Sequence, residues 1–179
     1  MKSKKIKEIT ASGLFIALGL VLPVIFHMFD QGSTFLPMHI PVLLAGFTLS
    51  LPYAAAVSVA TPLLSSALTG MPPLYPVLPY MVFELAVYAV GTNLLSRKMK
   101  LNVYLSLIIS MIAGRITAGA VVWAMISFFG TKLPGPLAFM ASAVTGGLPG
   151  ILIQVIVIPP LVLLLRKSGV LKDEGLKVG

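Results

Sequence analysis

Two ionisable residues, Glu84 and Arg115, lie within long apolar stretches of the sequence. A charged side chain is costly inside a membrane-spanning helix, so such residues usually face the interior of a helical bundle and indicate functional sites. Two roles are open for this pair. One or both residues can face a polar ligand, or the two can form a structural ion pair that holds their helices together. The two roles are compatible, because a ligand can share the pair.

Tyrosines accompany Glu84 at helical spacing. Tyr80, Glu84 and Tyr88 follow one another at four-residue intervals, which places them on one face of a helix. A tyrosine offers a flat apolar ring together with a hydroxyl group, and this combination suits a small, polar, aromatic ligand. The spacing therefore predicts one wall of a binding pocket.

A second face of the same kind contains Arg115. Arg115, Gly119 and Trp123 have the same four-residue spacing, and we expect Gly119 to leave room between the guanidinium and the indole. If this face lies opposite the tyrosines, the two faces form a pocket that opens towards the outer side of the membrane.

Three further polar residues complete the predicted site. His39, in the segment Pro-Met-His-Ile-Pro (37–41), can hydrogen-bond a ligand from above or cap its helix. Tyr75 can contribute to the site or to an interfacial aromatic belt, and Gln154 can do so or form hydrogen bonds between helices. The predicted ligand-binding residues are therefore His39, Tyr75, Tyr80, Glu84, Tyr88, Arg115, Trp123 and Gln154.

Several other kinds of chemistry are excluded by composition and motifs. The sequence contains no Cys, so it has no disulfide, thiolate nucleophile or cysteine-based metal site. Its two His residues and five acidic residues do not have the spacing of a metal site, so we expect no metal and no cofactor. The motifs G-x-S-x-G, H-E-x-x-H and the P-loop are absent. We therefore expect no enzymatic activity, and active transport would need energy from a partner or an ion gradient.

The pattern of charges along the sequence indicates which helices position these residues. Hydrophobic residues make up 58% of the sequence and charged residues 10%, whereas soluble domains have about 25% charged residues. Residues 31–83 and 133–165 contain no Asp, Glu, Lys or Arg. Most Lys and Arg residues cluster instead within 2–7, 97–100 and 166–177. Basic clusters that flank apolar stretches indicate a polytopic membrane protein rather than a nucleic-acid-binding protein.

Residues 36–68 decide the number of membrane crossings. A spanning helix needs about 20 residues, so this stretch is long for one helix and short for two. If it crosses twice, with a break at residues 50–52, every Lys and Arg faces one side except Arg115, within a span, and Lys132. The positive-inside rule favours this arrangement over a single crossing. Pro52 also suits the first turn of a helix, where its missing N–H costs nothing.

The sequence therefore predicts an all-α fold, a compact bundle of six transmembrane helices with both termini in the cytoplasm. The apolar stretch at the N-terminus has no small-x-small cleavage site before Asp30, so we expect it to be the first helix. Prolines and glycines predict that the last helix is kinked, and a kink can open a pocket. The predicted spans of this single domain (1–179) are 9–28, 37–50, 52–69, 75–96, 102–129 and 137–165.

The chain resembles a known family, the substrate-binding membrane subunits (S components) of energy-coupling factor (ECF) transporters, a branch of the ABC importers. The resemblance covers nearly the whole chain. The length of the chain, its six predicted helices and its predicted cytoplasmic termini all fit the family. The resemblance also rests on three segments: Ala-Ser-Gly-Leu-Phe-Ile-Ala-Leu-Gly (11–19), His-Ile-Pro-Val-Leu-Leu-Ala-Gly-Phe (39–47) and Leu-Thr-Gly-Met-Pro-Pro (68–73).

This resemblance implies a function and a set of partners. The chain would capture a water-soluble vitamin or related micronutrient outside a prokaryotic plasma membrane, under the loops between helices 1 and 2 and between helices 3 and 4. A transmembrane coupling subunit and two cytoplasmic ATPase subunits would then move the substrate by toppling this subunit in the bilayer. In the family, small residues of the first helix dock on the coupling subunit. The matching residues here are Ala11, Gly13 and Ala17, which depart from a strict Ala-x-x-x-Ala pattern.

The substrate and two rival functions are left open. Arg115 favours an anion such as pantothenate or nicotinate, because a guanidinium pairs well with a carboxylate. If Glu84 already neutralises Arg115, the pocket suits a neutral or cationic ring, such as a pyridoxine-like vitamer. One rival is a stand-alone secondary transporter with Glu84 as its proton relay, although the chain shows no inverted repeat. The other is a membrane scaffold without any small-molecule ligand.

Overall fold

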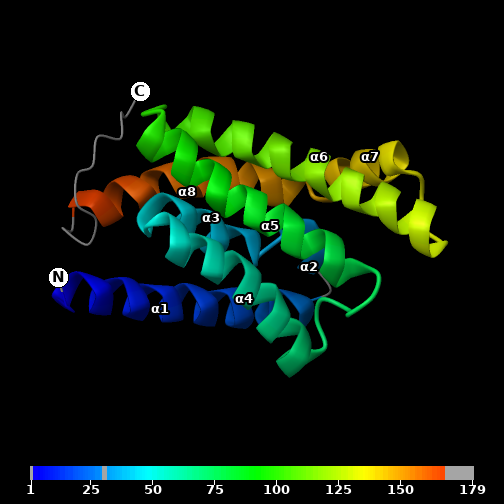
Figure 1. Ribbon diagram of the computed structural model, residues 1–179, viewed down its shortest axis with the longest axis horizontal. Helices are drawn as coiled ribbons and strands as arrows, with labels where there is room; N and C mark the ends of the chain where they lie inside the picture. Colours follow the sequence, from blue (N-terminus) through cyan, green and yellow to red (C-terminus); the bar gives the residue numbers. More distant parts are fainter. Residues whose placement is uncertain (1, 30–31, 168–179) are drawn as a thin grey trace.

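The computed structural model describes residues 2–29 and 32–167, and the regular secondary structure of this part is helical throughout. The helices run side by side along the long axis of the molecule (Figure 1). The all-α prediction is therefore confirmed. The helices are α1 (Lys2–His27), α2 (Gly32–Phe35), α3 (His39–Thr48), α4 (Leu51–Thr69), α5 (Val77–Asn93), which continues as a π-helical turn (Leu94–Lys98), α6 (Val103–Phe129), α7 (Pro136–Gly146) and α8 (Leu148–Lys167).

Within the described residues, five of these helices are long and apolar enough to cross a membrane: α1, α4, α5 with its π-helical turn, α6 and α8. Large apolar side chains are exposed on all five helices, as is typical of helices that face lipid. In α1, for example, only 17% of the most apolar 18-residue stretch is buried inside the protein. Two further apolar helices, α3 and α7, are shorter.

Residues 36–68 form two helices that meet near Ser50. Helix α3 ends at Thr48, and α4 begins at Leu51 with Pro52 in its first turn. At about 1.5 Å per residue, α3 is roughly 15 Å long, which is shorter than the span predicted over 37–50. Its residues are nearly all buried, and it packs against α1, α4, α5 and α8. The neighbouring helices thus shield α3 from lipid.

The last predicted span, over 137–165, is divided into two helices rather than kinked. Gly147 separates α7 from α8. A Cβ atom on Gly147 would lie 2.9 Å from Leu36 Cδ1, and one on Gly150 would lie 2.5 Å from the carbonyl oxygen of Phe35. The glycines therefore let α8 begin directly against α2 and the residue after it. Helix α7 has no buried residue, so it packs on the surface of the bundle.

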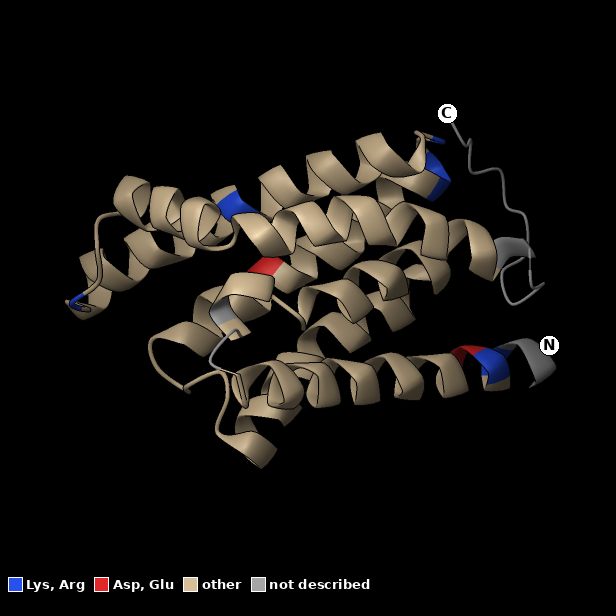
Figure 2. Cartoon of the chain, turned by 180° about the vertical axis from the view of Figure 1, so that it is seen from behind, with Lys and Arg blue, Asp and Glu red and all other residues tan. Residues whose placement is uncertain are grey.

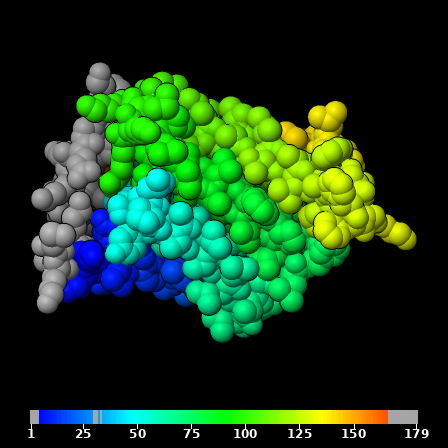
Figure 3. Space-filling view, viewed as in Figure 1, coloured from blue at the N-terminus to red at the C-terminus, as the bar shows by residue number. Residues whose placement is uncertain are grey.

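The centre of the bundle lies where α3 packs against α5. Val42, Leu43 and Phe47 of α3 and Leu85 of α5 are completely buried. Helices α4, α5 and α6 lie next to one another on one face of the molecule (Figure 3). This packing fixes the facing sides of α5 and α6, on which Glu84 and Arg115 lie.

Among the described residues, most charges gather at one end of the bundle, with exceptions at the opposite end and in the middle. Figure 2 shows basic residues where α1 begins and where α5 is followed by α6, whereas the loop between α6 and α7 at the opposite end holds a single basic residue, Lys132. Near the middle of the bundle, a basic residue of α6 lies beside an acidic residue of α5. These two residues are Arg115 and Glu84.

Candidate functional site

Glu84 of α5 and Arg115 of α6 form an ion pair. The distance from Arg115 Nη1 to Glu84 Oε1 is 3.0 Å, and the side chains are 12% and 2% exposed. A buried pair of this kind is stabilised only when good geometry and further hydrogen bonds offset the loss of hydration. Of the two roles left open by the sequence, the structural ion pair is therefore present, and this role is compatible with a ligand that shares the pair.

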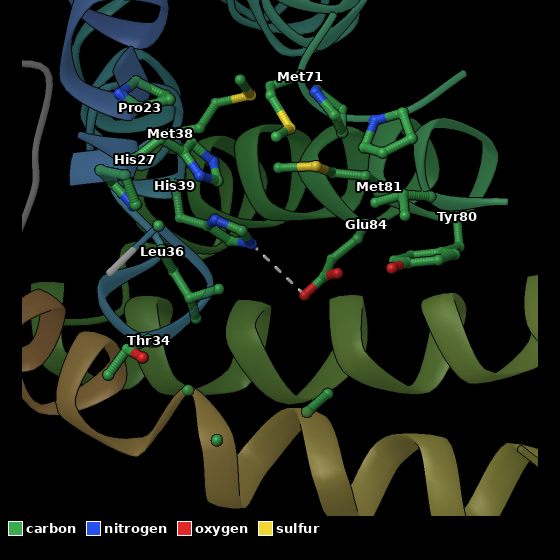
Figure 4. Close-up of a pocket in the computed structure, with 18 of the residues that line it drawn as sticks. Pro23, His27, Thr34, Leu36, Met38, His39, Met71, Tyr80, Met81 and Glu84 are labelled. Atoms are coloured by element: carbon green, nitrogen blue, oxygen red, sulfur yellow. Dashed lines mark ion pairs between the residues drawn. The ribbon is translucent and has the colours of Figure 1, made fainter. Parts of the chain in front are cut away.

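The contacts of the Glu84 carboxylate are concentrated on one oxygen. The Tyr88 hydroxyl donates a hydrogen bond of 2.8 Å to Oε1, the atom that also pairs with Arg115. His39 Nε2 lies 3.7 Å from the same oxygen, which is too long for a hydrogen bond. Figure 4 shows His39 and Glu84 facing each other, with the hydroxyl end of Tyr80 directed towards Glu84. The second oxygen, Oε2, has no hydrogen bond or ion pair among the described residues.

A cavity of about 420 Å³ lies beside this pair. Its volume is within the roughly 300–1,000 Å³ typical of small-molecule sites. Its walls come from the end of α1, from α2 and the start of α3, from the loop before α5, from α5 and α6, and from α7. The polar residues of the lining are His27, Thr34, His39, Tyr80, Glu84, Arg115 and Ser142.

Methionines and aromatic rings form much of the rest of the lining. Met38, Met71 and Met81 come from three different segments. The rings of Tyr80 and Phe139 meet edge to face, with their centroids 4.9 Å apart. Methionine sulfur makes favourable contacts with aromatic rings, so this lining suits a flat aromatic ligand. These methionines and Phe139 are not among the residues predicted from the sequence, because only the folded chain brings their segments together.

Four of the predicted site residues line the cavity, and two are buried outside its lining. His39, Tyr80, Glu84 and Arg115 are in the lining. Tyr88 is 1% exposed and supports Glu84 from behind through its hydrogen bond. Gln154 is completely buried in α8, and its two amide atoms have no hydrogen-bond partner among the described residues.

The other two predicted residues, Tyr75 and Trp123, lie outside the cavity. They are 55% and 56% exposed. The Tyr75 hydroxyl hydrogen-bonds to Thr131, and the Trp123 ring packs edge to face against Phe128 at 6.4 Å. Tyr75 precedes the start of α5, so the helical spacing does not extend to it. Trp123 follows Arg115 by eight residues, which rotates it by about 80° around the helix.

Two glycines of α6 control how closely the neighbouring helices approach. A Cβ atom on Gly114 would overlap the ring of Tyr88, so glycine at this position lets α5 and α6 pack tightly beside the ion pair. At Gly119, a Cβ atom would lie 2.5 Å from the sulfur of Met140 in α7. Gly119 therefore makes room for α7, and not for the space between Arg115 and Trp123 as the sequence had suggested.

Several buried nitrogen atoms at the site have no hydrogen-bond partner within the described part of the chain. They are both ring nitrogens of His39 and the Nε and Nη2 atoms of Arg115. More than about 90% of buried polar groups in proteins have a partner, so these atoms stand out as unsatisfied donors and acceptors at the site. Residues 2–29 and 32–167 contain no group of three or more His, Cys, Asp or Glu residues that could hold a metal ion.

Comparison with known proteins identifies the family. Residues 7–162 match the family model described as "ECF transporter, substrate-specific component". Searches of curated proteins and of solved structures found no match to this chain. The match covers most of the chain and confirms the resemblance seen in the sequence. The protein therefore belongs to the substrate-specific components of ECF transporters, which are multi-pass membrane subunits of transporters and not enzymes.

Proposed function

We propose that this chain captures a water-soluble vitamin or related micronutrient in the cavity beside Glu84 and Arg115. It then delivers the substrate together with a coupling subunit and two ATPases. The observation that carries this proposal is the cavity itself, where a buried ion pair and unpartnered nitrogens of His39 and Arg115 meet an aromatic and methionine lining. Such a combination of apolar walls and a few convergent polar groups is typical of small-molecule sites.

The direction of the cavity supports capture at the outer face of a plasma membrane. Helix α1 begins and α8 ends at the same end of the bundle (Figure 1), and basic residues cluster there (Figure 2). The positive-inside rule assigns this end to the cytoplasm. The cavity is lined by the opposite ends of α1 and α5 and by α7, and this lining supports a position in the outer half. The chain crosses the membrane six times if α3 also spans it, shielded from lipid by its neighbours, and if α7 remains on the outer side.

The exposed face of α1 is the proposed contact for the coupling subunit. Gly13 and Ala17 are exposed and Ala11 is half-buried, and a Cβ atom on Gly13 would meet nothing within 4 Å. Gly19 of the same helix differs, because a Cβ atom there would overlap Thr61 of α4. Helix α1 thus has a packed face and a free face of small residues, and small residues let membrane helices approach closely.

The ion pair bears on the choice between the two substrate classes. A free Arg115 guanidinium would favour a carboxylate such as pantothenate or nicotinate. Glu84 Oε1 lies only 3.0 Å away, and this pairing supports the alternative, a neutral or cationic ring such as a pyridoxine-like vitamer. The same pairing weakens the rival function as a proton-coupled carrier, since Glu84 is engaged by Arg115 and Tyr88.

The proposal is tested with the detergent-purified chain alone. Native mass spectrometry would detect a co-purified ligand, and thermal-shift measurements would screen a panel of water-soluble vitamins. We expect one vitamin to co-purify or to raise the melting temperature strongly. A well-folded chain that binds nothing in the panel would contradict the proposal. Uptake into liposomes that contain only this chain, driven by a pH gradient, would support the carrier instead.

A further inference from the structure

We propose that the cavity selects a ligand without net charge, namely an uncharged aromatic nitrogen heterocycle that presents a hydrogen-bond donor next to an acceptor. This inference rests on the capture function proposed above and specifies its substrate. It is carried by the charge of the lining, by the arrangement of free donors and acceptors, and by the shape of the apolar walls.

The charged groups of the lining cancel each other. Among the described residues that line the cavity, Glu84 and Arg115 are the only ones of the four charged types. They lie 3.0 Å apart and are largely buried, so with neutral histidines the lining has a formal charge of zero. A charged ligand would lose its hydration here without gaining a free counter-charge, which is costly in a buried site. An uncharged ligand avoids this cost.

The free polar atoms specify a donor beside an acceptor. Glu84 Oε1 is occupied by Tyr88 and Arg115, so Oε2 is the acceptor that a ligand donor can reach. Arg115 Nη2 and Nε are donors without a partner among the described residues, and a guanidinium has no acceptor. Because the two side chains are already paired, these atoms lie close together. A ligand must therefore offer a donor to the carboxylate and an acceptor to the guanidinium along one edge.

His39 adds a third polar contact on the same side. Its side chain is 3% exposed, it lines the cavity, and neither ring nitrogen has a hydrogen-bond partner within the described residues. A neutral imidazole provides one donor and one acceptor. The imidazole of His39 can therefore form a hydrogen bond with either a donor or an acceptor of the ligand. Together the three side chains recognise a ring edge of alternating N–H and N or C=O groups.

The walls suit a flat ring. Tyr80 and Phe139 form an edge-to-face pair on one side, and Met38, Met71 and Met81 contribute flexible sulfur-containing side chains. Figure 4 shows Tyr80, Met81 and Met71 around the space next to Glu84. An aromatic ring can contact the tyrosine by stacking and the methionines through sulfur–ring contacts. An aliphatic ligand would use these contacts less well.

The test compares uncharged and charged ligands that share one skeleton. The probes are nicotinamide, nicotinate and 1-methylnicotinamide; pantothenol and pantothenate; riboflavin and riboflavin 5′-phosphate; and pyridoxine. Any molecule that co-purifies with the chain is extracted and identified by mass spectrometry. We expect the bound ligand to be an uncharged ring. Tight binding of a carboxylate, a phosphate or a cation would overturn the inference and leave the capture function intact, whereas no binding at all would count against both.

Charge variants provide an independent readout of the same idea. E84Q gives the lining a formal charge of +1, R115Q gives it −1, and the double variant restores zero. We expect E84Q to shift the preference within a matched pair towards the anion by about tenfold or more, and R115Q to shift it away from the anion. The double variant should again prefer the uncharged member, although it binds it more weakly. If the preference does not follow the formal charge, the inference is wrong.

Discussion

Helices α3 and α5 meet at two ends that are built differently. At one, called here the closed end, Asn93 Nδ2 donates hydrogen bonds of 2.8 Å to the carbonyl oxygens of Gly46 and Leu49. Arg97 Nη2 donates one of 2.6 Å to the carbonyl oxygen of Thr48. The last carbonyls of a helix need such partners, and α5 supplies them to α3.

At the other, the open end, the same two helices leave polar atoms unused. His39 lies at the start of α3 and Glu84 lies in α5. Both line the cavity, which α7 also lines. The nitrogens of His39 have no hydrogen-bond partner in the described residues. The comparison teaches that one pair of helices serves two purposes. Its closed end stabilises the fold through hydrogen bonds, and its open end borders the cavity proposed as the ligand site.

The largest loss of stability is expected at the open end, where the ion pair between Glu84 and Arg115 is buried. The substitution Arg115→Ala leaves Glu84 buried without its counter-charge, and such a loss costs about 3–5 kcal/mol of unfolding free energy. Chemical unfolding in detergent measures it. The double variant E84Q/R115Q is the control and should lose much less. Equal stability of R115A and the wild type would show that the pair is not buried as described, and an unchanged ligand Kd in folded R115A would remove Arg115 from the site.

A smaller effect, confined to stability, is expected at the closed end. Asn93→Ala removes the donor to two carbonyl oxygens, at a total cost of about 1–3 kcal/mol. The same unfolding assay measures the loss, while the ligand Kd of the folded protein stays unchanged.

The control for this variant is Asn102→Ala, which removes only the N-cap of α6 and should cost about 1 kcal/mol. If N93A weakens ligand binding tenfold while the protein remains folded, the proposed division between a closed and an open end fails.

The smallest effect on stability is expected on α1. Gly13→Leu adds a side chain where nothing lies within 4 Å, so its unfolding free energy should change by less than about 0.5 kcal/mol. The matched variant Gly19→Leu drives a side chain into Thr61 and should be clearly destabilised. Co-purification with the coupling subunit measures the proposed docking. G13L should bind its ligand normally but lose the complex; an intact complex would move the docking face elsewhere.

Much of the fold could be predicted because charge and hydropathy are properties of the sequence itself. The charge-free stretches indicated membrane helices, and the segments 11–19, 39–47 and 68–73 indicated the family that the comparison then showed. Glu84 and Arg115 stood out for the same reason, since charges are rare in apolar helices. Their contact at 3.0 Å fits one of the two roles that the sequence left open.

The rest of the site depends on tertiary packing, which spacing alone does not determine. Met71 and Phe139 look like ordinary apolar residues in sequence, and only the arrangement of the loop before α5 and of α7 brings them to the cavity. Trp123 shows the converse, because its spacing from Arg115 suggested a shared face, yet its side chain is 56% exposed. Gly147 marks where the predicted last helix divides, because α8 needs close contact with Leu36 there.

The central claim is that the cavity at the open end is the ligand site, and one matched pair of variants tests it most directly. Ala143 lines the cavity from α7, whereas Ala141 of the same helix is exposed and lies outside the lining. The measurement is the Kd of the identified ligand for A143W and for A141W, by isothermal titration in detergent. We predict that A143W fills the cavity and abolishes binding while A141W binds like the wild type. Unchanged binding by folded A143W would contradict the account.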